Sequence, residues 1–221
     1  AGHGINPADL FKTWGRCSHL FLEGGMIMYR KYLKRWFDFI FALIALIILS
    51  PLFLCIFIVI KSNSAGPAVF KQARIGRNGQ VFQMYKFRTM ALNAPTNCPT
   101  HLFEKPEAFI TKPGKFMRGT SLDELPQLIN ILKGDMSIVG PRPSLVNQAD
   151  LILLRNNNGS SAVRPGLTGL AQINGRDELP IDQKANDGIY AEHITFLKDL
   201  KIIINTIFIV LTHSGIKEGK Q

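Results

Sequence analysis

Two adjacent carboxylates, Asp123 and Glu124, are the residues of this sequence best suited to chemistry. A carboxylate can attack an electrophilic centre or hold a metal ion, and two neighbours can divide those tasks. A structural explanation is also available, because acidic residues at the start of a helix complement its dipole without any further role. The local sequence alone favours that structural explanation.

The stretch around the two acids has the pattern of a short helix. Ser121 and Glu124 form a capping box, and apolar residues then recur at helical spacing as far as Gly134, a natural stop. Pro126 falls in the first turns, where a missing N–H costs little. The sequence therefore predicts a helix over residues 121–134 with both acids at its N-terminus.

Cationic side chains on a predicted hairpin could face these acids. Residues 68–90 predict two strands around an Asn78-Gly79 turn, and alternation along the second strand puts Lys86 and Arg88 on one face. A phosphate-facing role and a solvated strand face explain that pair equally well.

Further arginines flank the acids in the sequence. Residues 91–115 contain four prolines and predict a long loop near the site, and Arg118 follows it. Arg142 stands between two prolines that fix its backbone, which suits a bidentate contact to phosphate or uracil but also describes a rigid surface turn. Arg164 and Arg176 occur in tight glycine turns, which allow close approach to an anion or simply turn the chain.

An apolar run, Phe39–Ile60, holds 22 residues without a charge, and about 20 suffice to cross a bilayer. Ser50-Pro51 lies at its middle. The proline frees the carbonyl of Ile47 and costs roughly 3 kcal/mol in an ordinary helix, so a bend is expected there. The hydroxyl of Ser50 could satisfy the freed carbonyl.

Basic residues flank this run on both sides. They are Arg30, Lys31, Lys34 and Arg35 before it and Lys61, Lys71, Arg74 and Arg77 after it. Basic residues mark the cytoplasmic side, and each is favoured near an anionic surface by about 1 kcal/mol. A re-entrant helix that bends at Pro51 and returns satisfies both flanks, whereas a proline-kinked span with its N-terminus outside is the alternative.

Composition limits the remaining possibilities. The chain has 221 residues, of which 46% are hydrophobic, enough for one core and a membrane element. A net charge of +10 implies anionic partners, which could be nucleic acid, anionic lipid or a phosphorylated small molecule. The three cysteines, Cys17, Cys55 and Cys98, have no paired spacing, so neither a disulfide framework nor a zinc site is indicated and a reducing compartment fits best.

The predicted organisation has three parts. Residues 1–25 are an N-terminal extension or expression remnant, residues 26–61 are the basic flank and re-entrant membrane helix, and residues 62–221 form a catalytic domain on the cytosolic face. The fold class is α+β, a mostly helical domain with a small hairpin. The apolar segment 200–211 predicts a helix that lies on the membrane or docks to the re-entrant element, with an ordinary core helix as the alternative.

Taken in order, several motifs resemble those of a known family. They are MYRKYLKRWFD, the Ser50-Pro51 break, YKFRTM, SLDELPQLINILKGDMSIVGPRP and VRPGLTGLAQINGR. From about Met28 to Glu218 the chain is similar to the monotopic phosphoglycosyl transferases, also called bacterial sugar transferases, in their short single-domain form. In that family the membrane helix is re-entrant.

The resemblance implies transfer of a phospho-sugar from a UDP-sugar to polyprenol phosphate, usually undecaprenyl phosphate, with release of UMP. This is the first membrane step of glycan assembly, for lipopolysaccharide, capsule or exopolysaccharide. Asp123 matches the nucleophile that forms a covalent intermediate, and Glu124 matches the ligand of Mg²⁺. Arg118 and Arg142 match positions that hold the diphosphate and uridine. The remaining substrate-binding candidates are Lys86, Arg88 and Arg164.

The implied location is the cytoplasmic face of the bacterial inner membrane, with anionic lipid as a further partner and no nucleic acid. Two other functions compete with this one. A non-catalytic, membrane-anchored module would bind anionic ligands without releasing UMP, and a phosphohydrolase acting through Asp123 would yield free sugar phosphate. The sequence contains no HExxH motif, no GxxxxGK[ST] loop and no nucleic-acid motif.

Overall fold

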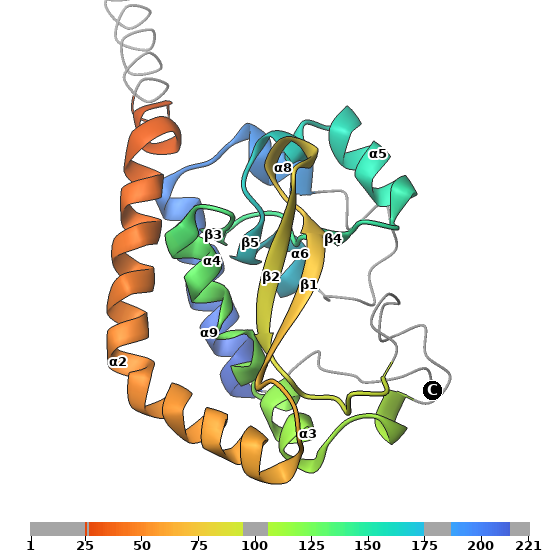
Figure 1. Cartoon of the computed structure of the whole chain (residues 1–221). Helices are drawn as coiled ribbons and strands as arrows, with labels where there is room; N and C mark the ends of the chain where they lie inside the picture. The colour runs from red at the N-terminus through yellow and green to blue at the C-terminus, as the bar shows by residue number, and fades with distance from the viewer. Residues whose placement is uncertain (1–24, 26, 95–105, 175–186, 213–221) are drawn as a thin grey trace, which may run out of the picture.

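The computed structural model describes residues 25, 27–94, 106–174 and 187–212, and shows an α+β arrangement (Figure 1). A long bent helix runs along one side, a β-hairpin lies near the centre, and shorter helices surround the hairpin. In these described ranges, helices predominate over two small sheets. The predicted fold class is confirmed. Arg176, two of the three cysteines and all of the predicted extension except Gly25 lie outside the described residues.

The long helix is α2, Lys34–Asn63, which follows a π-helical turn at Tyr29–Leu33. Its apolar length is sufficient to cross a membrane. It stays helical through Pro51, and Figure 1 shows it bending about half-way along. Ser50 Oγ donates a hydrogen bond of 2.8 Å to the carbonyl oxygen of Ile47, the acceptor that Pro51 leaves without an N–H. The expected bend and the expected hydrogen bond are both present.

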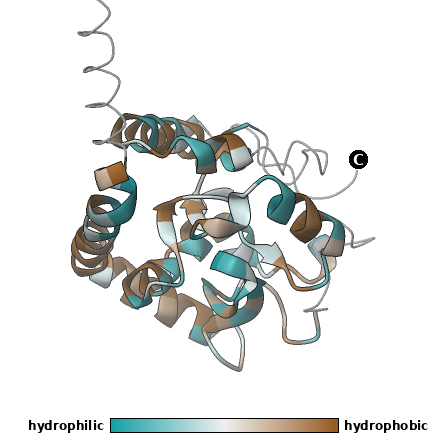
Figure 2. Cartoon of the chain, turned by 90° about the horizontal axis from the view of Figure 1, so that it is seen from above, coloured by the Kyte–Doolittle hydropathy of each residue, from teal (hydrophilic) through white to brown (hydrophobic). Residues whose placement is uncertain are grey.

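Both arms of α2 pack against the same body of helices and strands. On the arm before Pro51, Ala42 is fully buried in a cluster with Leu128 and Ile131. On the arm after Pro51, Ile56 and Ile60 are buried with residues of the hairpin and of the helix that follows it. Figure 2 shows that α2 is hydrophobic along much of its length. The other side of the helix exposes large apolar side chains, which include Trp36, Ile40, Ile44, Ile47, Ile48, Leu54, Phe57 and Ile58.

The hairpin consists of β1, Val69–Ile75, and β2, Val81–Phe87, which pair antiparallel over their full length. Asn78 and Gly79 at its turn have φ angles of 55° and 75°, the left-handed conformation that Asn-Gly favours in tight turns. Strand β4, Ser144–Leu145, joins the other edge of β1. The predicted hairpin is confirmed.

A second, parallel pair of strands carries the chain towards Arg142. It consists of β3, Ser137–Val139, and β5, Gly166–Thr168. Beside it the backbones approach so closely that a Cβ on Gly169 would lie 2.0 Å from the carbonyl oxygen of Gly140. Glycine is required at such a contact because no side chain fits. This close packing fixes the start of the turn that holds Arg142.

Helix α3, Lys112–Gly119, begins inside the segment that was predicted to be a loop, so the prediction for residues 91–115 is wrong at its end. Thr111 Oγ1 accepts a hydrogen bond of 3.1 Å from the N–H of Gly114, which caps the helix. Pro113 lies in the first turn, where proline is well tolerated. The four prolines of this segment favoured a loop, but Pro113 occupies a helix start.

The remaining described helices are α4 (Gln127–Lys133), α5 (Ala149–Asn157), α6 (Leu170–Ile173), α8 (Asp187–Glu192) and α9 (Phe196–Thr212). The helix predicted over residues 200–211 is confirmed as part of α9. One face of α9 is buried through Asp199 and Ile202, and the other exposes apolar side chains, among them Leu197, Leu200, Ile204, Ile207, Phe208 and Leu211. Helix α9 is therefore amphipathic and docked by one face.

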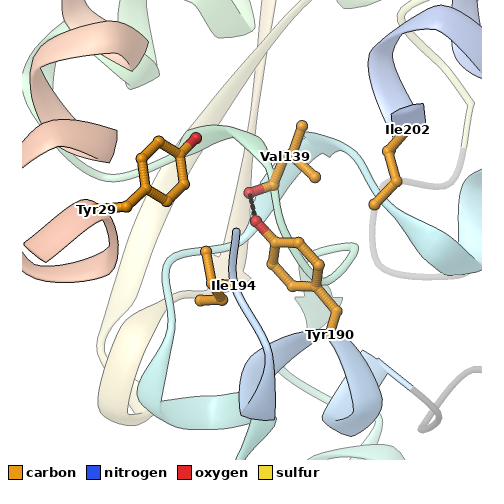
Figure 3. Packing of buried hydrophobic residues seen from close by; sticks show 5 residues of the cluster. All are labelled: Tyr29, Val139, Tyr190, Ile194 and Ile202. Carbon is orange, nitrogen blue, oxygen red and sulfur yellow. Dashed lines mark hydrogen bonds between the residues drawn. The ribbon is translucent and has the colours of Figure 1, made fainter. Parts of the chain in front are cut away.

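A core cluster joins the start of the long helix to the C-terminal helices. Figure 3 shows Tyr29, Val139, Tyr190, Ile194 and Ile202 packed together. The hydroxyl of Tyr190 lies 3.1 Å from the carbonyl oxygen of Val139 and 2.6 Å from the carboxylate of Asp199. Asp199 also accepts hydrogen bonds from the Tyr29 hydroxyl at 2.8 Å and from Lys34 at 2.7 Å. Residues at opposite ends of the chain thus share one buried carboxylate.

Candidate active site

The two acids lie in a 3₁₀ turn, Leu122–Glu124, that precedes α4. Ser121 has a φ of 57°, and its side chain makes no capping hydrogen bond, so the predicted capping box is wrong. The left-handed Ser121 turns the chain after α3, and its carbonyl oxygen accepts the N–H of Glu124 at 3.2 Å. Because α4 begins only after Pro126, the acids lie ahead of that helix and not in its first turn.

Asp123 is 8% exposed, so its carboxyl is largely removed from water. Its pKa is raised to about 6: burial is the largest cause and the neighbouring Glu124 also raises it, whereas Lys86 and Arg118 lower it. These two cations keep the pKa low enough for the carboxylate to be ionised at neutral pH in a poorly solvated site. A carboxylate in that state is a candidate nucleophile.

Glu124 contacts two cations through one oxygen. Lys86 Nζ donates to Glu124 Oε1 at 2.8 Å, and Nη1 of Arg142 lies 3.9 Å from the same oxygen. Lys86 comes from β2, Arg118 from α3, and Arg142 from the turn after β3. Three of the predicted cations therefore gather around the acids from three separate elements.

Asn130 supports this arrangement, a role that was not predicted from the sequence. It is fully buried in α4, where Oδ1 accepts the N–H of Tyr85 at 3.0 Å and Nδ2 donates to the carbonyl oxygen of Gln83 at 2.7 Å. These bonds fix β2 against α4 and hold Lys86, the next residue, beside Glu124. The signal in the sequence was an amide within an otherwise apolar helical stretch.

Two other predicted substrate-binding residues, Arg88 and Arg164, hold backbone in place. Arg88 is buried and donates to the carbonyl oxygens of Ser64 and Ala65, just beyond α2. It does not share a strand face with Lys86, because β2 ends at Phe87. Arg164 Nε donates to the carbonyl oxygen of Gly134 at 2.9 Å, at the far end of α4 from the acids. The contacts of both arginines are those of structural residues.

The family model described as bacterial sugar transferase matches residues 29–213, which includes both acids and the three cations around them. The chain belongs to the bacterial sugar transferase family. The resemblance inferred from the sequence motifs is confirmed.

Individual relatives are similar to this chain over most of its length. It is 40% identical over 187 residues to an uncharacterized sugar transferase, EpsL, of Bacillus subtilis, covering 84% of this chain and 91% of that protein. It is 36% identical over 200 residues to an undecaprenyl-phosphate galactose phosphotransferase of Salmonella typhimurium, covering 84% of this chain and 42% of that protein.

A third relative is the UDP-glucose:undecaprenyl-phosphate glucose-1-phosphate transferase of Escherichia coli, 38% identical over 186 residues, with 80% of this chain and 40% of that protein covered. The chain thus spans about two fifths of the length of its Salmonella and Escherichia relatives.

The oxygen donors of Asp123 and Glu124 fit a magnesium ion. Mg²⁺ prefers oxygen ligands and is commonly held by one or two carboxylates, with waters and substrate phosphates completing its coordination. No cluster of three or more His, Cys, Asp or Glu side chains occurs among the residues that the structure describes. The acid pair could therefore supply part of the coordination of such an ion.

Proposed function

We propose that the protein transfers a phospho-sugar from a UDP-sugar to a polyprenol phosphate and releases UMP. The observation that carries this proposal is the buried Asp123 beside Glu124, with Lys86, Arg118 and Arg142 around them. Cations at this density would hold a diphosphate within reach of a carboxylate. The names of the Salmonella and Escherichia relatives, both undecaprenyl-phosphate transferases of a sugar or sugar phosphate, support the substrate class.

In the first step, a carboxylate oxygen of Asp123 attacks the sugar-bearing phosphorus of the UDP-sugar. A P–O bond forms to Asp123, the bond from that phosphorus to the bridging oxygen breaks, and UMP leaves with the electron pair. The protein then carries an aspartyl phospho-sugar. Lys86 and Arg142, which lie beside Glu124, are placed to offset the charge that develops on the leaving phosphate.

In the second step, a phosphate oxygen of the polyprenol phosphate attacks the same phosphorus. The bond to Asp123 breaks, the carboxylate is restored, and the product is a polyprenol diphosphate sugar. Because UMP leaves before the acceptor reacts, the scheme predicts ping-pong kinetics.

Glu124 would hold Mg²⁺ in this scheme, together with the substrate phosphates. When bound, the ion would neutralise the diphosphate and the leaving UMP. The chain's own residues do the remaining work: Lys86 orients Glu124 through its hydrogen bond of 2.8 Å, and Arg118 favours the ionised form of Asp123.

Incubation of the full chain with a panel of UDP-sugars and MgCl₂ tests the function. We expect one sugar to raise the intact protein mass by one phospho-sugar and to release a matching amount of UMP, and continued release to require polyprenol phosphate. Free sugar phosphate in the absence of acceptor would instead identify a phosphohydrolase. Ligand binding without UMP release would identify a non-catalytic module, and either outcome overturns the proposal.

The raised pKa of Asp123 predicts a pH-dependent rate. Attack requires the carboxylate form, and a group with a pKa of about 6 becomes mostly protonated below that pH. We therefore expect kcat/KM for UMP release to fall about tenfold per pH unit below about pH 6 and to level off above about pH 7. A pH series at constant Mg²⁺ measures this, and a profile that is flat down to pH 5 would contradict the role of Asp123.

We further propose that α2 enters the cytoplasmic face of the bacterial inner membrane and returns to that face. Both arms of α2 pack on one catalytic body, through Ala42 before the bend and through Ile56 and Ile60 after it. That body cannot lie on both sides of a bilayer, so contact with both arms supports re-entry. The apolar face of α9 and the basic flanks would then meet lipid tails and anionic headgroups.

Single cysteines at the two ends of α2 test the re-entrant path. Lys31→Cys and Ser62→Cys, each made in a chain whose three natural cysteines are replaced by serine, place exposed thiols on either side of the apolar run. We expect a membrane-impermeant maleimide to label both thiols in inside-out vesicles and neither in right-side-out vesicles. Labelling of the two thiols from opposite faces would show that α2 crosses the membrane.

A further inference from the structure

A buried ion pair lies next to the backbone of Arg142. Arg155 of α5 donates from Nη2 to Oδ2 of Asp187, the first residue of α8, at 3.0 Å. Its Nη1 donates to the carbonyl oxygen of Arg142. The backbone N–H of Arg142 interacts with Asp187 and lowers the pKa of that carboxyl. The pair therefore holds the peptide groups on both sides of Arg142.

This pair is a poor source of stability. The side chains of Arg155 and Asp187 are 9% and 1% exposed. Burial lowers the pKa of Arg155 and raises the pKa of Asp187, so it disfavours the charged form of each. Among the residues that the structure describes, Arg155 Nε and Asp187 Oδ1 have no hydrogen-bond partner. Incompletely bonded buried pairs are often no better than apolar residues of similar volume. A positional role explains the pair more fully than a stabilising one.

The position that the pair controls is that of a site residue. Pro141 and Pro143 fix their own φ angles but leave the orientation of the peptides around Arg142 to other contacts. The guanidinium of Arg142 lies 3.9 Å from Glu124, so a rotation of its backbone would move that group away from the acids. A displacement of about 1 Å at such a group is enough to weaken binding and catalysis.

We propose that Arg155 and Asp187 are positioning residues that direct the guanidinium of Arg142 towards the phosphate of a bound uridine nucleotide. The ligand class rests on the proposed function, whereas the mechanical role rests on the hydrogen bond of Arg155 to the carbonyl oxygen of Arg142 and on its pairing with Asp187. Neither residue touches the nucleotide. The effect of removing them should therefore pass entirely through Arg142.

A double-mutant cycle tests this dependence with UMP binding as the readout. Arg155→Met alone would leave a buried, unpaired Asp187. Both members of the ion pair are therefore replaced together, as Arg155→Met with Asp187→Leu, which leaves no buried charge at this position. UMP is titrated by calorimetry, in MgCl₂, into the full chain carrying the paired change, Arg142→Met, or both. We expect UMP to bind about tenfold more weakly to the paired variant and about tenfold more weakly to Arg142→Met. The variant that combines these changes should bind UMP no more weakly than Arg142→Met alone.

Two results would overturn the inference. One is an unchanged Kd in the paired variant, and the other is the same tenfold loss when the paired change is added to Arg142→Met. Arg77→Met is a matched control, since Arg77 also donates to a backbone carbonyl, that of Ala162, but is exposed; its Kd should not change. Thermal unfolding confirms that each variant is folded. If the wild-type chain binds UMP but does not form UMP from any UDP-sugar, the proposed function is wrong. The double-mutant cycle still tests the positioning role, because it measures only UMP binding.

Discussion

Asp123→Asn is expected to abolish transfer and to eliminate the phospho-sugar adduct. Asparagine has nearly the same shape, but its neutral amide cannot attack phosphorus and form the acyl phosphate. Removal of a catalytic nucleophile typically costs on the order of 10⁴-fold to 10⁶-fold in rate. UMP release over several decades of enzyme concentration, with intact mass measured in parallel, gives the size of the loss.

The same variant should be more stable than the wild type, which separates lost chemistry from lost folding. Burial raises the pKa of Asp123 from 3.8 to about 6, so the folded protein binds this proton more tightly than the unfolded chain does. Stability therefore falls as the pH rises between about 4 and 6. Above about pH 6 the buried charge of Asp123 lowers the free energy of unfolding by on the order of 2–3 kcal/mol.

Asparagine carries no such charge, so the melting temperature of Asp123→Asn in EDTA at pH 7.5 should exceed that of the wild type. At pH 4 the difference should largely vanish, because Asp123 is then protonated in the folded protein. Adduct formation at the wild-type rate in this variant would show that another residue is the nucleophile.

Glu124→Gln is expected to lower the rate by on the order of 100-fold or more and to raise the Mg²⁺ concentration needed for half-maximal activity. Glutamine keeps an oxygen but loses the charge that holds the ion. It also turns the ion pair with Lys86, which donates to Glu124 at 2.8 Å, into a weaker hydrogen bond to a neutral amide oxygen. A magnesium titration of UMP release measures both effects.

Lys86→Met provides the comparison for this variant. It removes the hydrogen bond to Glu124 but leaves both carboxylates in place, so the rate should fall while the Mg²⁺ dependence changes less than in Glu124→Gln. If Glu124→Gln shows the wild-type Mg²⁺ dependence, Glu124 is not the residue that holds the ion.

Features governed by neighbouring residues were predictable from the sequence. The Asn78-Gly79 turn determines the hairpin, because both residues adopt positive φ. Pro51 determines the acceptor that Ser50 satisfies, since a proline always frees the carbonyl four residues before it. The same local chemistry singled out Asp123 and Glu124, although it could not decide between capping and catalysis.

Features governed by tertiary packing were not predictable from the sequence. Ser121 has the sequence of a helix cap, but the turn between α3 and α4 holds it in a left-handed conformation and removes the capping box. Arg88 looked equivalent to Lys86 by strand alternation, yet the end of α2 captures its guanidinium. Which arginines face the acids depends on where the elements end, and those ends are defined by contacts between residues far apart in sequence.

The shared carboxylate of Asp199 implies an order of assembly during synthesis. Tyr29 and Lys34 cannot reach this partner until residue 199 has left the ribosome, roughly 10–30 s after Lys34 at about 5–20 residues per second. Until then Lys34 has Asp38 as an ionic partner on the next turn of the helix, 3.8 Å away in the finished fold. Helix α2 is therefore synthesised well before the carboxylate that fixes its N-terminal end, and it is fixed there only when α9 packs beside it.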